Sequence, residues 1–324
     1  MISRVIDSLK RHNRFLVTTH VDVEPDALGS ELALSRLLIS LGKKVIVCND
    51  GPTPCEYNFL PHLNMIKRPK DISPGEFDAA IAVDCSDLSR LGITGKLIPR
   101  EKLLLNIDHH IRNTRFAKIN WVNPSASSCA ELIYRIYKKL HKSIDKRVAL
   151  LLYSAIVSDT GSFKYPNTTA FTHQMATDLL LWNLPINKIY QNIYENITFS
   201  QVRIIAEVLR DLHQDSVGKI AYFALSKDLL NSKEGNSDLS DYILNFARAI
   251  KDVELVIFFK PAVSKSQTRV SFRSKGKIDV SLLAGFFGGG GHRTASGCTI
   301  KASMSCAKKM VLAKAKSLIK DLKK

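Results

Sequence analysis

The 324-residue sequence lacks the features of membrane, exported and disulfide-bonded proteins. No apolar run approaches the ~20 residues that span a bilayer. Residues 1–12 are charged and lack the apolar core of a signal peptide, so nothing predicts export. The six cysteines are scattered and include no CxxC pair, which predicts reduced thiols rather than a disulfide framework or a structural zinc site. We therefore expect a globular protein of the cytoplasm.

Acidic residues are few compared with basic ones. The 30 Asp and Glu stand against 47 Lys and Arg, which gives a formal net charge of +17. Such a surplus predicts anionic partners, for example nucleotides or nucleic acid, without choosing between them. Hydrophobic residues make up 45% of the chain, which argues against disorder. Eight of the lysines lie within residues 301–324, where their spacing predicts the solvated side of an amphipathic helix.

The first half of the chain alternates short apolar runs with amphipathic stretches. Runs that are apolar and bounded by turn residues, as buried parallel strands are, occur at Phe15–Thr19, Lys44–Cys48, Ala79–Asp84 and Leu103–Ile107. Helical patterns occur at Ala27–Leu41, Ser128–Leu140 and Arg147–Ser158. Strands that alternate with helices predict a doubly wound α/β domain, whose ligands bind beyond the carboxyl ends of its parallel strands.

The second half changes its pattern. Residues 172–213 have a wholly helical pattern, and strand-like runs follow at Lys219–Leu225, Glu254–Lys260 and Thr268–Arg273. A Gly-rich loop and a final helix over Ser303–Leu322 complete the chain. We expect an α/β domain over residues 1–185, a helical linker over 186–214 and a smaller α/β domain over 215–324.

Histidines and carboxylates follow the ends of several predicted elements. They are His20, Asp22, Glu24 and Asp26 after the first strand, Asp84 and Asp87 after the third, Asp108, His109 and His110 after the fourth, and Asp159 at the end of a helix. A single Asp after a strand is more often a helix cap or a turn former. Because four segments share one topological position, we expect their side chains to converge on one crevice.

The chemistry of this donor set indicates a metal site. Imidazole nitrogen combined with carboxylates, and without thiolate, suits Mn²⁺ or Mg²⁺ better than structural Zn²⁺. A carboxylate that bridges two such ions would create a site for attack on phosphorus.

Four motifs of the sequence resemble those of the DHH phosphoesterases. They are His20-Val-Asp-Val-Glu24-Pro-Asp26, Val83-Asp84-Cys-Ser-Asp87, Asp108-His109-His110 and Ser158-Asp159-Thr-Gly. The segment Phe287-Gly-Gly-Gly-Gly-His292, followed by Ala295-Ser-Gly297, resembles the signature of the DHHA1 domain in that family. These motifs extend over nearly the whole chain in the family's order. They are most similar to the stand-alone branch of bifunctional oligoribonucleases (nanoRNases) and pAp phosphatases.

The resemblance implies a phosphoesterase of the oligoribonuclease or 3′(2′),5′-bisphosphate nucleotidase type. Its substrates would be short 5′-phosphorylated oligonucleotides or pAp, its cofactors two Mn²⁺ ions (with Mg²⁺ or another divalent ion as an alternative), and its nucleophile a metal-bound hydroxide. One ion would be held by His20, Glu24 and Asp84, and the other by Asp26, Asp84, His109 and Asp159. His110 would face the scissile phosphate, and Asp108 would orient the histidines.

The second domain would bind the nucleotide distal to the cleaved bond. The residues that the resemblance implies for this are Arg273, Ser274, Gly288, Gly289, Gly290, Gly291 and His292. Consecutive glycines let backbone N–H groups approach an anion, and an Arg side chain binds phosphate through two donors. An anchor at a fixed distance from the metal ions favours short substrates. We expect the site to lie between the domains, with the helical segment as a hinge.

One residue departs from the family pattern. Glu24 stands where the family has Asp, and its extra methylene moves the carboxylate outward, so Asp22 is an alternative ligand. The sequence leaves open a dinucleotide phosphodiesterase, a RecJ-like single-strand exonuclease and, in another class, a nucleotide-binding module with a decayed metal site. Family II pyrophosphatases share the first motifs but not the Gly-rich one. We expect no membrane partner, and a homodimer is left open.

Overall fold

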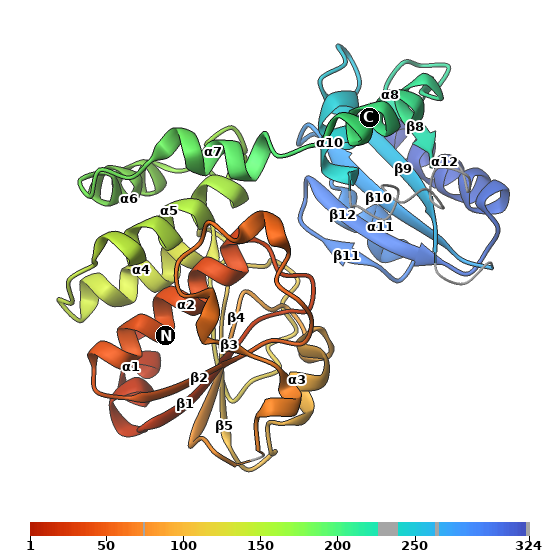
Figure 1. Ribbon diagram of the computed structural model, residues 1–324. Coiled ribbons are helices and arrows are strands. Elements are labelled where there is room, and N and C mark those ends of the chain that lie inside the picture. Colours follow the sequence, from red (N-terminus) through yellow and green to blue (C-terminus); the bar gives the residue numbers. More distant parts are fainter. Residues whose placement is uncertain (74, 226–238, 263–265, 322–324) are drawn as a thin grey trace. The chain divides into compact units, whose positions relative to one another are not determined.

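The structure is a computed structural model that describes residues 1–73, 75–225, 239–262 and 266–321. The chain divides into two compact units, Met1–Asn196 and Ile197–Lys324, and each is built around its own sheet (Figure 1). The α/β fold class expected from the sequence is confirmed. The residues expected to form a linker include α7 (Ile186–Tyr194) and α8 (Phe199–Arg210), which belong to different units.

A parallel sheet forms the centre of the first unit, with the strand order β3-β2-β1-β4-β5-β6. Its strands are β1 (Arg14–Thr18), β2 (Lys44–Cys48), β3 (Ile66–Lys67), β4 (Ala79–Val83), β5 (Leu103–Asp108) and β6 (Ile119–Val122). Along β1, Phe15 and Val17 pack into the larger core, whereas Leu16 packs into a smaller core on the other face. Apolar side chains on both faces are what a covered parallel sheet requires.

Helices cover this sheet. They are α1 (Ile2–Arg11), α2 (Pro25–Ser40), α3 (Gly92–Lys96), α4 (Cys129–Lys139), α5 (Lys146–Asp159), α6 (Ala170–Leu180) and α7, with short 3₁₀ helices η1 (Cys55–Tyr57), η2 (Leu63–Met65), η3 (Pro69–Asp71) and η4 (Leu88–Leu91). The helices α2, α4 and α5 lie together on one face (Figure 1). At Gly29 of α2, a Cβ atom would lie 2.6 Å from the carbonyl oxygen of Leu151 in α5. Glycine therefore allows these two helices to pack closely.

The strand order places a switch point between β1 and β4. The chain proceeds from β1 outward to β2 and β3, and from β4 outward in the opposite direction to β5 and β6. Ligands of open α/β sheets bind at this point, beyond the carboxyl ends of the strands. His20 lies two residues after the end of β1, and Asp84 directly follows β4.

The second unit contains a mixed sheet in the order β11-β12-β10-β9-β8-β7, in which β8 pairs with β9 in parallel and the other pairs are antiparallel. Its strands are β7 (His213–Gln214), β8 (Ile220–Ala224), β9 (Leu255–Pro261), β10 (Thr268–Ser274), β11 (Gly290–Gly291) and β12 (Ala295–Ile300). The helices α8 and α10 (Ser240–Arg248) pack on one face. The helices α11 (Val280–Phe286) and α12 (Met304–Asp321) pack on the other.

Three expectations need correction or limitation here. The Gly-rich segment is not wholly a loop, because Gly290 and Gly291 form β11 and pair with β12. The helical pattern expected up to residue 213 ends earlier, since His213 begins β7. Leu322, the expected end of the last helix, lies outside the described residues.

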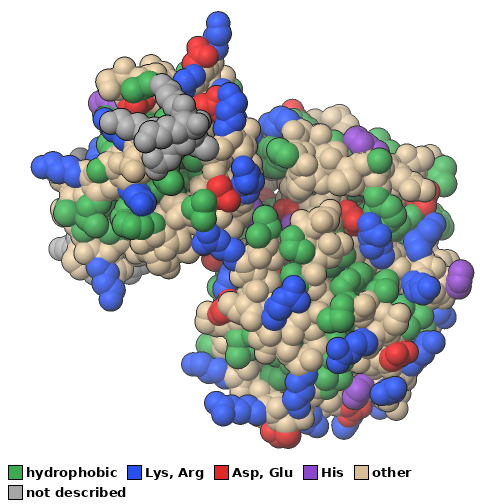
Figure 2. Space-filling view, turned by 180° about the vertical axis from the view of Figure 1, so that it is seen from behind, with side chains coloured by type: hydrophobic (Ala, Val, Ile, Leu, Met, Phe, Trp, Pro, Cys, Tyr) green, Lys and Arg blue, Asp and Glu red, His purple; other side chains and the backbone are tan. Residues whose placement is uncertain are grey.

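The basic residues of the last helix whose burial the structure describes are exposed or half-buried. Ala307, Val311 and Ala315 are buried at helical spacing in α12, whereas Lys309 and Lys316 are exposed. Figure 2 shows Lys and Arg side chains spread over the visible surface with other side chains between them. Within the described residues, no helix combines the length and apolarity needed to cross a bilayer.

The cysteines are all unpaired. Cys48, Cys85, Cys129 and Cys298 are buried, and Cys55 and Cys306 are exposed. Burial raises the pKa of the Cys85 thiol to about 12 and that of the Cys298 thiol to about 11. A thiol that stays protonated is a poor nucleophile, so burial disfavours a reactive role for Cys85 and Cys298.

Candidate metal centre

The carboxyl ends of β1 and β4 bring His20 and Asp84 together. His20 Nε2 lies 3.6 Å from Asp84 Oδ2 and 3.7 Å from Glu24 Oε1. The side chains of His20 and Asp84 are buried, whereas that of Glu24 is 46% exposed. The residue that departs from the family pattern thus still directs its carboxylate to the cluster, despite its extra methylene.

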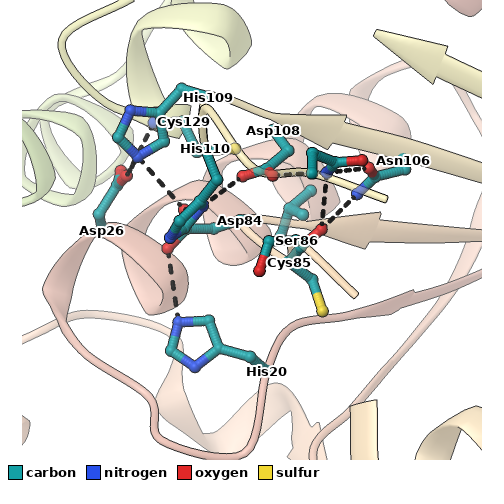
Figure 3. Close-up of polar contacts among 12 residues, drawn as sticks. His20, Asp26, Asp84, Cys85, Ser86, Asn106, Asp108, His109, His110 and Cys129 are labelled. Atoms are coloured by element: carbon teal, nitrogen blue, oxygen red, sulfur yellow. Dashed lines mark hydrogen bonds and ion pairs between the residues drawn. The ribbon is translucent and has the colours of Figure 1, made fainter. Parts of the chain in front are cut away.

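A second group of donors lies on the other side of Asp84. His109 Nε2 is 3.4 Å from Asp159 Oδ2, 3.8 Å from Asp26 Oδ2 and 3.5 Å from Asp84 Oδ1. The two oxygens of Asp84 therefore face different groups, with Oδ2 toward His20 and Oδ1 toward His109 (Figure 3). This arrangement allows Asp84 to be shared between two cations.

The backbone at this position is unusual. Asp84 has a φ of 52°, in the left-handed region that residues other than glycine rarely occupy. Its N–H donates to the carbonyl oxygen of Ile107 at the end of β5. Strained backbone of this kind is concentrated at functional sites.

Asp159 is the last residue of α5, where the helix dipole disfavours a carboxylate. Asn167 anchors this helix end, because its Nδ2 donates to the carbonyl oxygen of Asp159 at 3.0 Å and to that of Ser127 at 2.8 Å. The unfavourable position of Asp159 is explained if its carboxylate binds a cation.

Asp26 is held by a helix other than its own. It lies in the first turn of α2, and its carboxylate accepts the backbone N–H groups of Cys129 at 2.7 Å and Ala130 at 3.0 Å, at the start of α4. The N-cap position of α2 belongs to Glu24, whose side chain makes no capping hydrogen bond. The contact with α4 fixes the carboxylate on the wall of the cluster.

The close approach of these groups shifts their pKa values. Burial alone would raise the pKa of Asp84, but His109 and His20 hold it well below its ordinary range. Burial alone would lower the pKa of His20, but Asp84 and Glu24 raise it to about 9. Burial raises the pKa of Asp26 to about 8. Protons therefore remain on this cluster at neutral pH, where a cation would replace them.

Several observations fit a divalent cation. Both oxygens of Asp84 are buried, and neither has a hydrogen-bond partner among the described residues. The spacings of 3.4–3.8 Å between the facing atoms exceed a hydrogen bond. Ligands at about 2.1 Å from a common ion are roughly 3–3.5 Å apart. The set of nitrogen and carboxylate donors suits Mn²⁺ or Mg²⁺.

His110 is oriented by a carboxylate. Its Nδ1 lies 2.8 Å from Oδ1 of Asp108, whose side chain is fully buried at the end of β5. Burial alone would lower the pKa of His110, but the Asp108 carboxylate raises it. The structure thus places His110 in contact with Asp108, next to the candidate metal ligands, and their roles toward a phosphate stay a prediction.

Two acidic residues of the motifs stay outside the cluster. Asp22, the alternative ligand, is exposed and belongs to none of the metal-binding groups among the described residues. Asp87 caps η4, because its Oδ1 accepts the N–H of Ser89 at 2.9 Å. The ordinary role of an Asp after a strand therefore holds for Asp87.

In the second unit, the structure gives backbone reasons for the glycines. A Cβ atom on Gly289 would lie 2.2 Å from the carbonyl oxygen of Gly297, and one on Gly291 would lie 2.6 Å from that of Ala295. Gly288 has a φ of 73°. These contacts require glycine for the close approach of this segment to β12, and binding of phosphate by Gly288–Gly291 stays a prediction.

The other expected binding residues of this unit also make local contacts. Arg273 lies on β10 and its Nη1 donates to the carbonyl oxygen of Phe272 at 3.0 Å. The hydroxyl of Ser274 is buried and donates to the carbonyl oxygen of Ile278. The N–H of His292 donates to the carbonyl oxygen of Ala295.

Residues behind the cluster were missed from the sequence. Glu31 of α2 is fully buried, and its Oε1 accepts a hydrogen bond from Asn49 Nδ2 at 2.6 Å. Asn106 is buried within β5, and Asn113 lies close to Asp108. An amide within the apolar run Leu103–Ile107 was a visible signal for Asn106. No local pattern distinguishes Glu31 or Asn113.

Known proteins share the sequence and the fold. The bifunctional oligoribonuclease and PAP phosphatase NrnA of Bacillus subtilis is 27% identical over 304 residues, which cover 93% of each chain. The protein of the same name from Thermus thermophilus is 29% identical over 286 residues, or 88% of this chain and 83% of that one. A solved structure, of an exopolyphosphatase-related protein from Bacteroides fragilis, has a TM-score of 0.87 at 26% identity and covers 100% of this chain and 97% of that chain.

Family models match both parts of the chain. The model for the N-terminal domain of the DHH family matches residues 14–156, and the model for the DHHA1 domain matches residues 201–322. Both agree with the motifs that carried the sequence-based prediction, which is confirmed. The chain belongs to the DHH/DHHA1 phosphoesterase family.

Proposed function

We propose that this protein hydrolyses phosphate esters in short 5′-phosphorylated oligonucleotides and in pAp, with two divalent cations, Mn²⁺ in the first place. The observation that carries the proposal is the buried carboxylate of Asp84, whose two oxygens face two separate groups of imidazole and carboxylate donors. The names of the relatives, oligoribonuclease and PAP phosphatase, support the choice of substrates.

The residues of the cluster would have two roles, cation binding and phosphate binding. His20, Glu24 and Asp84 hold one cation, and Asp26, Asp84, His109 and Asp159 hold the other. Such a pair of ions activates water and stabilises charge on the phosphoryl oxygens. His110, oriented by Asp108, binds the phosphate whose ester bond is cleaved.

The second unit would supply an anchor for the substrate. Arg273 and His292 carry side chains that suit phosphate, and the Gly288–Gly291 segment lies between them in sequence. An anchor that recognises one end of the substrate makes the rate depend on chain length, since binding energy is then used to place one bond at the cations.

The substrate assay uses the full chain, stripped of metal and resupplied with Mn²⁺ or Mg²⁺. The substrates are 5′-labelled RNA of two to about 24 nucleotides, pAp and a linear dinucleotide. We expect turnover of pAp and of the shortest RNAs, with rates that fall as the chain lengthens. Rates that rise with length would favour an exonuclease of the RecJ type. Preference for the dinucleotide alone would favour a dinucleotide phosphodiesterase, and nucleotide binding without turnover would favour a binding module.

A pair of variants tests the shared carboxylate. Asp84→Asn keeps the size of the side chain but removes the charge that both donor groups face, so hydrolysis should fall by more than about 100-fold. Asp87→Asn is the matched control, since it removes a charge three residues away and keeps a residue that can cap η4. Comparable rates of the two variants would refute the assignment of the metal site.

A further inference from the structure

Two asparagine side chains behind the His110–Asp108 pair have no role in the function proposed so far. Asn106 is fully buried in β5, and Asn113 is half-buried three residues after His110. A buried amide costs free energy unless its hydrogen-bonding groups are satisfied. Its partners therefore show what the amide is for.

The two amides form a chain of hydrogen bonds that ends on Asp108. Asn113 Nδ2 lies 2.6 Å from Asp108 Oδ2 and 2.7 Å from Asn106 Oδ1. Asn106 Nδ2 donates to the carbonyl oxygen of Cys85 at 3.0 Å and to that of Ala82 at 3.3 Å. The backbone of β4 and the residues after it thus fix the amide of Asn106, whose oxygen is left to accept from Asn113.

The orientation of Asn113 is determined from both ends. Its Oδ1 accepts the backbone N–H of Arg115 at 2.6 Å, while its Nδ2 faces three oxygen atoms: Oδ2 of Asp108, Oδ1 of Asn106 and, at 3.1 Å, the carbonyl oxygen of Cys85. If the amide were flipped, its oxygen would face the carboxylate of Asp108 and its NH₂ group would face the N–H of Arg115. A carboxylate can only accept hydrogen bonds, so only the observed orientation pairs donors with acceptors.

The contact with Asn113 decides how the carboxylate of Asp108 is used. One of its oxygens is occupied by Asn113, and the other lies 2.8 Å from His110 Nδ1. A second acceptor is near, because Asp84 Oδ1 lies 3.7 Å from the same ring nitrogen. If the Asp108 carboxylate rotated away, Asp84 would become the acceptor for the Nδ1–H of His110. Asp84 Oδ1 would then be less available to bind a cation.

We propose that Asn113, oriented by Asn106, is a positioning residue: it holds Asp108 so that Asp108, and not Asp84, accepts the Nδ1 proton of His110. This fixes the direction of the His110 ring and keeps Asp84 for cations. The inference deepens the proposed hydrolysis and rests on it for the catalytic consequence. The placement of the Nδ1 proton does not depend on turnover.

The test combines a spectroscopic and a kinetic measurement on the full chain. The protein is labelled with ¹⁵N-histidine and loaded with Mg²⁺, and the Nδ1–H signal of His110 is assigned by its absence in His110→Gln. We expect Asn113→Ala to exchange this proton with water at least about 10-fold faster, because its acceptor is no longer fixed. We also expect kcat on pAp to fall by roughly 10- to 100-fold with KM within about twofold.

Asn120→Ala is the matched control. Asn120 is also a half-buried amide in the neighbouring segment, but its side chain bonds to the backbone of Ala117. This variant should keep both the Nδ1–H signal and kcat. The same loss in Asn120→Ala as in Asn113→Ala would reduce the role of Asn113 to loop stability and overturn the proposal.

A second variant distinguishes the role of the Asn113 donor from that of its acceptor. It also replaces Asn113→Ala in the test if that variant does not fold. Asn113→Asp keeps an acceptor for the Arg115 N–H but removes the donor to Asp108. Assayed above about pH 8, where the facing carboxylates do not share a proton, it should lose kcat at least as strongly as the Ala variant. Retention of kcat would overturn the inference. An inactive wild type whose Nδ1–H signal still depends on Asn113 would refute the hydrolysis while supporting the positioning.

Discussion

Each imidazole of the cluster presents a ring nitrogen to carboxylates, so protons and cations compete for the same atoms. His20 faces Glu24 and Asp84, and His109 faces Asp84 and Asp159. The raised pKa values of both histidines follow from these neighbours. A cation that binds must displace these protons, so the affinity of the site for metal falls as the pH is lowered.

Glu24 is the residue whose contribution to metal binding is least obvious. Its carboxylate lies near His20 although its side chain is 46% exposed. Glu24→Asp shortens the side chain by one methylene and so moves the carboxylate away from His20. We expect Mn²⁺ to bind more weakly to one of the two sites, by a factor of several up to about 10. Titration calorimetry measures this, with Asp22→Glu as a charge-matched control, since it also changes one methylene and keeps the carboxylate. Tighter binding by Glu24→Asp would mean that Glu24 marks a weakened site.

Glu31 makes the stability of the metal-free protein depend on pH. Burial raises the pKa of Glu31 from its ordinary 4.5 to about 8, against the opposing effect of its bond with Asn49. Between these values the folded chain holds a proton that the unfolded chain has lost. The free energy of unfolding therefore falls, by roughly 1.4 kcal/mol per pH unit from this group, as the pH rises.

Glu31→Gln isolates this effect, because glutamine keeps an acceptor for Asn49 and cannot ionise. We expect urea unfolding of the wild type, measured with a chelator present, to lose stability relative to the variant from pH 5 to pH 8. Parallel pH profiles would show that Glu31 is not protonated in the folded chain.

The candidate ligands that follow the ends of strands could be predicted from the sequence. The residues that hold those ligands in place could not. His20, Asp84 and Asp108 follow strands, so the rule for parallel sheets was enough to group them. The partner of Asp26 is a helix start more than 100 positions away, at Cys129, which no local pattern reveals. The same holds for Asn113, whose contact with Asp108 depends on the turn between them.

At the scale of elements, continuous apolar runs were the most predictable. The expected strand Lys44–Cys48 has the bounds of β2. The strand β12 was missed because its residues, Ala295–Ile300, are mostly small or polar and their pairing with β10 and β11 determines the strand. The strands β3 and β6 were also missed from the sequence. Each is short and only partly buried, so neither contains a continuous apolar run.

Helix packing gives a prediction at this scale. Gly29→Ala would place a Cβ atom 2.6 Å from the carbonyl oxygen of Leu151, which is backbone and has little freedom to move. The helices α2 and α5 would have to separate, and we expect a loss of about 1–3 kcal/mol in the free energy of unfolding of the first unit. Denaturant unfolding followed by circular dichroism measures it, and an unchanged midpoint would show that the helices adapt.

At the scale of the whole molecule, each unit has apolar cores of its own. One large core packs α2, α4 and α5 against the first sheet, and two cores cover the faces of the second sheet. The predicted metal ligands all belong to the first unit. Units with separate cores are able to unfold separately.

Calorimetry of the full chain should therefore show two transitions. Mn²⁺ at 100 times its dissociation constant should stabilise the first unit by about 2.7 kcal/mol for each site that it fills and leave the transition of the second unit unchanged. Asp84→Asn should abolish the shift. A single transition that moves as a whole on addition of metal would show that the two units unfold together.

The distribution of the thiols offers a way to observe the two units in solution. Cys55 is exposed in the first unit and Cys306 in the second, while the other four thiols are buried. A maleimide fluorophore pair would therefore attach to the natural sequence at one place in each unit. Energy transfer between the two dyes would then report how their separation responds to nucleotide and metal, without any engineered cysteine.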